Sequence, residues 1–334
     1  MKSYQNSTPY SYDEIFRIEQ EIYEKTQIKQ DITPENVDIQ EVLTRETRIL
    51  KDKEYNLPQS IFTIEEENGR VIVGRKIWSI LSQENKINAP HCSMITSSML
   101  LGPLKKLNQK ETDISVEYHP FTDGEKITFF DIIKNNPKNN IFYPFVYRRF
   151  HDRQEKVCSP EGWNLNPEKV TYLGHGEEHI RLYTREMFKT MDMSHKVIYD
   201  PACSTGQFLK EFKDSQPKCI TIGHDLSQDM INYAKDFVDQ HLCCNAAGSP
   251  LEEKSADVMF IRFLNSEIVS KKDAEILFKT LVTKIKKNGL IIVFGHTPVL
   301  LEKKYFEDLG LIVKSSLAYS KKYNAIFQYY VLKA

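Results

Sequence analysis

The stretch "VIYDPACSTGQFLKEF", residues 197 to 212, carries the pattern that decides the fold. An apolar run ends on Asp200, small residues follow, and a pattern with helical spacing begins at Gly206. A buried strand that turns into a helix is the repeating unit of α/β sheets, whose ligands bind beyond the carboxyl ends of the strands. The stretch therefore predicts one strand end at the ligand-binding edge of such a sheet.

The sequence after residue 165 repeats this alternation of strand, loop and helix. Strands are expected at 196–200, 218–225, 241–244, 257–263, 289–294, 311–317 and 325–332. Most of these are unbroken apolar runs, which is typical of strands that helices bury on both faces. Helices fit between them, including one for which Ser227 is the expected N-cap. We predict a doubly wound, seven-stranded α/β sheet in residues 166–334.

Residues 1–165 have a different character. Charged helical stretches such as "YDEIFRIEQEIYEKT" (12–26) alternate with short strand-like runs, and the spacers are rich in Asn, Lys, Pro and Asp. Since single cores stop growing near about 250 to 300 residues, a chain of 334 residues has room for two domains. We expect an N-terminal domain over 1–165, mainly helical with some strand, that serves as a lid, a substrate wall or a dimerisation surface.

The composition limits the classes of partner. Lys plus Arg number 45 against 46 Asp plus Glu, a formal net charge of -1, so no global positive field attracts nucleic acid or an anionic membrane. The beginning of the sequence lacks the pattern of a secretory signal, and no run approaches the roughly 20 apolar residues of a membrane span. We expect a cytoplasmic protein.

The six cysteines are scattered, without the density of a disulfide scaffold or two CxxC pairs placed for zinc. We therefore expect reduced thiols and no metal. An alternative is a metal site of His241, Cys243 and Cys244. Neighbouring residues on a strand point to opposite faces, which disfavours this alternative.

Two acids mark the ends of the first two predicted strands. Asp225 ends the second strand, 19 residues after Gly206, and its two acceptor oxygens suit the two hydroxyls of a ribose. The turn "PACSTG" has one glycine instead of the three of the dinucleotide fingerprint, and Asp200 is a poor neighbour for phosphate. Asp200 is a good neighbour for an amino group. A nicotinamide-dependent oxidoreductase is therefore the less favoured alternative.

Four segments, taken in order, resemble the motifs of a known family. "DPACSTGQFL", "IGHDLSQDMINYAK", "CNAAGSPLEEKSADVMFIRF" and "IKKNGLIIVF" are similar in order and spacing to those of class I S-adenosylmethionine-dependent methyltransferases, over roughly residues 170 to 334. The resemblance implies S-adenosylmethionine as cofactor and S-adenosylhomocysteine as product. We expect a methyl transfer to O, N or C of a small molecule in specialised metabolism. The alternatives are a nucleic-acid or protein methyltransferase, or a non-catalytic partner protein that keeps the fold.

The resemblance also implies roles for individual residues. Asp200 would contact the methionyl amino group, Gly206 would give backbone clearance for the cofactor, and Asp225 would hold the ribose. The other residues expected at the cofactor are Pro201, Ala202 and Cys203 in the first turn, Leu226, Asn245 and Ala246 around the adenine, and Arg262 and Phe263 through their backbones near the methionine part. Ser204 departs from the family pattern, which usually has glycine there, and serine visits positive φ less readily.

The phrase "DPACSTG" also resembles the "DPACGTG" of DNA adenine methyltransferases. Those enzymes carry an [Asn/Asp/Ser]-Pro-Pro-aromatic motif after the fourth strand, which grips the exocyclic amine of a flipped base. Here the corresponding place reads "RFLNSEIV" (262–269). The missing motif and the absence of a basic excess disfavour nucleic acid as the substrate.

The acceptor side offers a base and a helix. His296 directly follows the fifth predicted strand and is the best candidate for a general base, whereas His224 is expected to pack on the opposite face from Asp225. By resemblance, the segment before the first strand closes over the cofactor, with Arg181 at the methionyl carboxylate. The residues expected at the acceptor are Tyr172, His175, His179, Tyr183 and Asn265. The alternative is an ordinary docking helix with solvated arginines.

Overall fold

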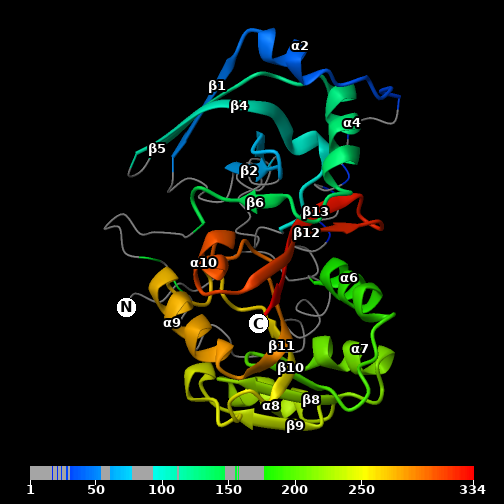
Figure 1. Ribbon diagram of the computed structural model, residues 1–334, viewed down its shortest axis with the longest axis vertical. Coiled ribbons are helices and arrows are strands. Elements are labelled where there is room, and N and C mark those ends of the chain that lie inside the picture. Colours follow the sequence, from blue (N-terminus) through cyan, green and yellow to red (C-terminus); the bar gives the residue numbers. More distant parts are fainter. Residues whose placement is uncertain are drawn as a thin grey trace. The chain divides into compact units, whose positions relative to one another are not determined.

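The computed structural model describes residues 31–53, 61–76, 93–110, 113–146 and 177–334, together with Arg17, Glu21, Glu24, Ile28, Glu155 and Val157 (Figure 1). The chain forms two compact units. The described part of the C-terminal unit falls within Val157–Lys314 and Tyr329–Ala334, and that of the N-terminal unit within Ser7–Lys156 and Ser315–Gln328. The boundary expected between residues 165 and 166 lies outside the described residues.

The C-terminal unit is built on the predicted seven-stranded sheet. Its strands are β7 (Val197–Asp200), β8 (Ile220–Asp225), β9 (Gln240–Cys243), β10 (Ala256–Ile261), β11 (Ile285–Phe294), β12 (Ile312–Ser320) and β13 (Ala325–Lys333). They lie in the order β12-β13-β11-β10-β7-β8-β9. The neighbouring strands from β11 through β9 are parallel, and β13 pairs with β11 in the antiparallel direction. The predicted doubly wound sheet is confirmed.

Helices cover both faces of this sheet. They are α6 (Glu178–Phe188), α7 (Gln207–Ser215), α8 (Gln228–Ala234), α9 (Lys271–Val282) and α10 (Lys303–Asp308). Figure 1 shows α6 and α7 on one side of the strands and α9 on the other. Ser227 is the N-cap of α8, as predicted, because its side chain accepts a hydrogen bond from the Met230 backbone N–H.

The order of the strands shows where on the sheet a ligand is expected to bind. The chain leaves β7 toward β8 and β9, then returns to the other side of β7 with β10 and β11. Strand order therefore reverses between β7 and β10, and ligands of such sheets bind at the carboxyl ends beside this switch point. Asp200 is the last residue of β7, and Arg262 directly follows β10. Two residues of opposite charge thus meet at the switch point.

Aromatic packing fixes the helices over these strands. Phe260 of β10 contacts Phe208 and Phe212 of α7, with ring centroids 4.9 and 5.3 Å apart, and Phe188 of α6 at 6.0 Å. All four side chains are buried. Buried aromatic rings contribute much of the apolar area of a core, so α6 and α7 are held against the strands that carry Asp200 and Arg262.

The N-terminal unit differs from its prediction. Its strands are β1 (Arg48–Lys53), β2 (Ile61–Glu65), β3 (Val71–Arg75), β4 (Leu100–Gln109), β5 (Asp113–Tyr118) and β6 (Asn140–Phe142), in the order β1-β5-β4-β3-β2-β6. Helices α2 (Ile39–Thr44) and α4 (Asp123–Ile133) accompany them. The expectation of a mainly helical domain is wrong for the described residues.

The reason for this error lies in strand composition. The neighbouring strands from β1 through β6 in this sheet are antiparallel. The second half of β4 faces solvent, and its sequence loses its apolar character after Leu104. Antiparallel sheets with one exposed face alternate polar and apolar residues, which is a weaker signal than the continuous apolar runs of the other unit. The helical pattern at 12–26 lies almost wholly outside the described residues.

The hairpin of β12 and β13 belongs to both units. Its tip, Ser315–Gln328, is part of the N-terminal unit, where Ile326 and Ile95 exchange backbone hydrogen bonds of 2.9 and 2.7 Å. Gln328 also donates to the Ile141 carbonyl at 2.8 Å. The two units therefore share a continuous pair of strands.

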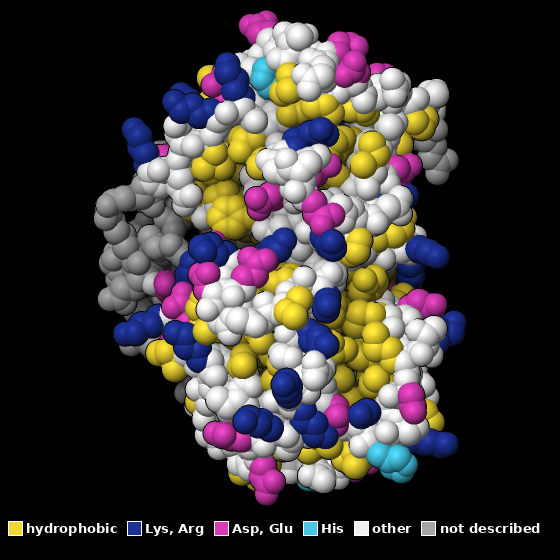
Figure 2. All heavy atoms as spheres, viewed as in Figure 1, with side chains coloured by type: hydrophobic (Ala, Val, Ile, Leu, Met, Phe, Trp, Pro, Cys, Tyr) yellow, Lys and Arg dark blue, Asp and Glu magenta, His cyan; other side chains and the backbone are white. Residues whose placement is uncertain are grey.

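On the face drawn in Figure 2, Lys and Arg side chains occur together with Asp and Glu side chains, and several Lys and Arg lie near one another in the lower half of the view. In the part of the chain that the structure describes, no helix has the length and apolar character needed to cross a bilayer.

Candidate active site

The turn after β7 is held by backbone contacts to β8. The Cys203 N–H donates to the His224 carbonyl at 2.7 Å, and Ser204 adopts a positive φ of 54° that aims its own N–H at Asp225. Gly206 has a φ of 77°, and a Cβ there would lie 2.9 Å from the Cα of Ala234 in α8. Close packing on α8 and the positive φ thus account for this glycine, where the sequence had suggested clearance for a cofactor.

Asp225 lies at the tip of β8 with its carboxylate oriented by the backbone. Its Oδ2 accepts from the Ser204 N–H and its Oδ1 from the Ser227 N–H, both at 2.9 Å. A carboxylate has about four lone-pair sites, so each oxygen can accept a further hydrogen bond. Burial raises the pKa of Asp225, and the backbone hydrogen bonds act in the opposite direction. The neighbouring Leu226 side chain is 60% exposed. The Asp225 carboxylate and the exposed Leu226 side chain together suit a nucleoside, whose sugar has hydroxyls and whose base has an apolar face.

The loop after β9 is tied to the same strand end. The Cys244 N–H donates to the Asp225 carbonyl at 2.9 Å. The exposed Asn245 accepts from the Ala247 N–H at 2.9 Å and begins a 3-10 turn, η3 (Ala246–Gly248). Asn245 and Ala246 therefore lie near the tip of β8, on a loop whose position depends on Asp225.

Asp200 and Arg262 form a buried cluster with Glu177 at the switch point. Asp200 is fully buried; its Oδ1 accepts from the Ala202 N–H at 3.1 Å and its Oδ2 from Arg262 Nε at 2.9 Å. Arg262 Nη1 donates to Glu177 Oε2 at 2.6 Å, and its guanidinium lies over the ring of Phe208 at 5.0 Å. The sequence prediction considered only the Arg262 backbone and missed Glu177.

Charge in this cluster is unbalanced. Burial alone would lower the pKa of Arg262, but the Asp200 and Glu177 carboxylates outweigh it and raise that pKa above its ordinary value. Arg262 therefore stays a cation. Burial raises the pKa of Asp200, whereas Arg262 acts in the opposite direction. When both acids are ionised, two carboxylates around one guanidinium leave one net negative charge at the carboxyl ends of β7 and β10.

Comparison with known proteins agrees with this geometry. Residues 199–293 match the family model described as a methyltransferase domain. Isonocardicin synthase of Nocardia uniformis subsp. tsuyamanensis is 28% identical over 290 residues, which cover 86% of this chain and 95% of that protein. The match coincides with the doubly wound sheet and the acids at the tips of β7 and β8. The chain thus contains a methyltransferase domain of the class I S-adenosylmethionine-dependent type.

Solved structures of methyltransferases are also similar. The plantazolicin methyltransferase BpumL in complex with SAH is 15% identical with a TM-score of 0.39, over 52% of this chain and 93% of that chain. A SAM-dependent methyltransferase from Aquifex aeolicus is 17% identical with a TM-score of 0.40, over 51% of this chain and 100% of that chain.

The methyltransferase unit brings the exits of β10 and β11 together. A Cβ on Gly295 would lie 3.5 Å from the Arg262 carbonyl oxygen and 3.8 Å from Asn265 Nδ2. His296 follows this glycine and is half-buried. Asn265 is buried, and its Oδ1 accepts from the Glu267 N–H at 3.0 Å, while Phe263 is a buried packing residue. His296 therefore begins its loop beside the segment that carries Arg262.

Helix α6 of the methyltransferase places its predicted site residues in packing contacts. Arg181 is buried and its Nε pairs with Glu211 Oε1 of α7 at 2.8 Å. The Tyr183 ring meets that of Tyr329 in β13 edge-on, with centroids 4.9 Å apart, and His179 is buried. These contacts suit a docking helix, although Arg181 is buried and not solvated as that alternative had it. The roles of these three residues at the cofactor and the acceptor stay predictions. Tyr172 and His175 lie outside the described residues.

His224 faces the core, as predicted. Its Nδ1 lies 3.2 Å from the Tyr199 hydroxyl and 3.3 Å from Ser249 Oγ, and the Tyr199 hydroxyl donates to Ser249 at 2.8 Å. Burial lowers the pKa of His224, so the imidazole is neutral at ordinary pH. This network connects β7 and β8 with the loop after η3.

The cysteines of the methyltransferase unit behave as thiols. Burial raises the pKa of Cys203 well above its ordinary value, which opposes a nucleophilic role. Cys243 donates to the Leu226 carbonyl at 3.5 Å. Within the described ranges, no group of three or more His, Cys, Asp or Glu side chains is placed to hold a metal ion.

Proposed function

We propose that this methyltransferase binds S-adenosylmethionine at the tips of β7, β8 and β10 and transfers its methyl group to O, N or C of a small molecule in specialised metabolism. The observation that carries the proposal is the carboxylate of Asp225. Its oxygens are each fixed by one backbone N–H, keep acceptor capacity for two ribose hydroxyls, and lie beside the exposed Leu226.

The residues of the chain serve binding and alignment. S-adenosylmethionine, when bound, supplies a sulfonium group that activates the methyl carbon. Asp225 accepts from the ribose hydroxyls, Leu226 packs against the adenine, and Asn245 and Ala246 lie along its edge. Holding the acceptor in line with the activated carbon, away from water, lowers the activation free energy by several kcal/mol.

A base is needed when the acceptor carries a proton. We assign this role to His296, because its loop leaves β11 beside Arg262 and Asn265 at the carboxyl edge of the sheet. His296 would take the proton from the acceptor atom, and such assistance contributes typically about 100-fold or more. Asn265, whose side chain closes its own turn, would orient the loop on the acceptor side.

The class of acceptor follows from surface and relatives. The formal net charge of -1 favours a small molecule over a nucleic acid, for which a basic excess would be required. Similarity to isonocardicin synthase covers 86% of this chain, far more than the methyltransferase domain match, which supports a role of the N-terminal unit in the same reaction. We propose that this unit contributes to acceptor recognition or to a homodimer, and that the enzyme acts in the cytoplasm.

Product analysis tests the proposal. The protein is incubated with S-adenosylmethionine and fractionated metabolites of its host, with the Asp225→Ala protein as control. Mass spectrometry should find S-adenosylhomocysteine together with a product that is heavier by one CH2 group.

The sulfonium charge activates three carbons, and the name of the relative does not say which carbon that enzyme transfers. Appearance of 5′-methylthioadenosine in place of S-adenosylhomocysteine would show that the amino-acid arm is transferred. That outcome would overturn the methyl transfer while leaving the binding of the cofactor intact.

A further inference from the structure

The acid at the end of β7 is closed to direct contact with a ligand. Asp200 has no exposed surface, and both of its oxygens are already engaged, Oδ1 by the Ala202 N–H and Oδ2 by Arg262 Nε. A ligand ammonium would have to displace Arg262 to reach this carboxylate. Displacement would leave a guanidinium buried without its partner, which costs several kcal/mol.

Glu177 carries the other carboxylate of the cluster and is open. Its side chain is 20% exposed, and Arg262 Nη1 donates to Oε2 at 2.6 Å. None of the described residues donates to Oε1. The backbone of Glu177 is fixed at the start of α6, because its carbonyl accepts from the N–H groups of Ile180 and Arg181. A rigid, half-satisfied carboxylate therefore lies beside Arg262 at the switch point.

Arg262 also keeps donors for a ligand. A guanidinium has five N–H donors, of which Nε goes to Asp200, one on Nη1 to Glu177 and one on Nη2 to the Ala202 carbonyl at 3.4 Å. Two donors remain. An open carboxylate next to a guanidinium with spare donors is complementary to an ammonium next to a carboxylate, which is an α-amino acid zwitterion.

We propose that Glu177 binds the ammonium group, and Arg262 the carboxylate, of the methionyl end of S-adenosylmethionine, in place of Asp200. Asp200 then acts as a positioning residue that orients Arg262. The inference rests on the proposed binding of S-adenosylmethionine. The net negative charge of the cluster is retained when a zwitterion binds, and it favours a cationic sulfonium nearby.

The test compares two ligands that differ only at this end. S-adenosylhomocysteine carries the amino-acid arm, whereas 5′-methylthioadenosine has a methyl group instead. Calorimetry on the full chain should show that Glu177→Gln weakens S-adenosylhomocysteine about tenfold or more, since a charge-assisted hydrogen bond is lost. Affinity for 5′-methylthioadenosine should stay within about twofold. Glu186→Gln, an exposed glutamate on the same helix, is the matched control and should change neither affinity.

The outcomes separate the inference from the function on which it rests. Wild-type protein that fails to bind S-adenosylhomocysteine would contradict the proposed function itself. Wild-type binding with an unchanged affinity in Glu177→Gln would overturn only the role of Glu177. An equal loss for both ligands, with an unchanged melting temperature, would also overturn it, because it would place Glu177 near the nucleoside instead of the amino-acid arm.

Discussion

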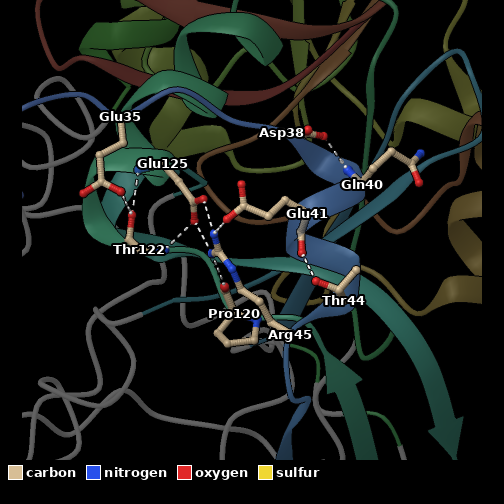
Figure 3. A network of polar contacts seen from close by, with 9 residues as sticks. All are labelled: Glu35, Asp38, Gln40, Glu41, Thr44, Arg45, Pro120, Thr122 and Glu125. Atoms are coloured by element: carbon tan, nitrogen blue, oxygen red, sulfur yellow. Dashed lines mark hydrogen bonds and ion pairs between the residues drawn. The ribbon is translucent and has the colours of Figure 1, made fainter.

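Each unit of the molecule contains an arginine between carboxylates, and the two clusters differ in how completely they are satisfied. In the N-terminal unit, Arg45 donates Nη1 and Nη2 to the two oxygens of Glu125 at 2.6 and 2.7 Å (Figure 3). Glu125 also accepts from the Thr122 N–H at 2.8 Å and completes the capping box at the start of α4. Nη2 of Arg45 reaches Glu41, in the first turn of α2, at 3.3 Å. This cluster joins two helices.

In the methyltransferase unit, one arginine and two carboxylates are arranged differently. Arg262 gives a single N–H to each of its two acids, and the open acid lies at the carboxyl end of a parallel sheet. A bidentate pair with a cap uses up its donors and acceptors, whereas single contacts leave some for a ligand. The two clusters have similar charges but differ in their unused donors and acceptors. We infer that these unused positions, more than charge, distinguish a binding site from a structural ion pair.

The largest effect is expected from Arg262→Met. Removing the guanidinium leaves Asp200 buried and unpaired, and breaking a buried ion pair in this way costs about 3 to 5 kcal/mol of unfolding free energy. Urea unfolding followed by circular dichroism measures this loss. The double variant Arg262→Met with Asp200→Asn should recover part of it. A loss below about 1 kcal/mol would contradict the view that Asp200 depends on Arg262.

A second prediction concerns a residue that belongs to neither cluster. His296→Ala should lower kcat by about 100-fold or more, because it removes the proposed base, and should leave the Kd for S-adenosylhomocysteine unchanged. His241→Ala, at an exposed position of β9, is the matched control. Full activity of His296→Ala would exclude the base role. A change in Kd would instead place this loop at the cofactor.

The third prediction separates the two acids at the strand ends. Asp225→Ala should weaken S-adenosylhomocysteine about ten- to a hundredfold, since it removes charge-assisted hydrogen bonds of roughly 1.5 to 3 kcal/mol. Because ribose is common to both ligands, 5′-methylthioadenosine should weaken equally, in contrast to the Glu177→Gln variant. Asp229→Ala, an exposed acid in the first turn of α8, should have no effect. Unchanged affinity would show that another residue holds the ribose.

The parts of this site that the sequence predicted are those with local causes. Asp225, Ser227 and Gly206 follow from one strand, one cap and one turn, each encoded within a few residues. The seven strands could be placed because unbroken apolar runs give a strong signal. Even there, β11 begins at Ile285, four residues before the strand expected at 289–294, so that it includes the basic residues Lys286 and Lys287.

The features that escaped prediction depend on contacts between distant segments. Glu177 lies 85 residues from Arg262, and no local pattern relates them. Arg181 looked available for a ligand because its partner, Glu211, is on another helix. A basic residue directly after the strand beside Asp200 was the only available signal for the cluster, and strand order was needed to interpret it.

The smallest effect is expected in the N-terminal cluster. Arg45→Met should lower the unfolding free energy by about 1 to 2 kcal/mol, less than Arg262→Met, because the Arg45 side chain is 28% exposed and water can solvate Glu125 in part. Lys105→Met, which breaks an exposed pair with Glu117, is the control and should cost less than about 1 kcal/mol.

The Kd for S-adenosylhomocysteine decides whether the comparison between the clusters holds. Four of the five N–H donors of Arg45 are used within its own unit, and both oxygens of Glu125 are engaged. Arg45→Met should therefore leave this Kd within about twofold of the wild-type value. A tenfold change without unfolding would mean that a fully satisfied ion pair also governs ligand binding. In that case unused hydrogen-bonding positions would not distinguish the two clusters, and the assignment of Glu177 would lose its physical basis.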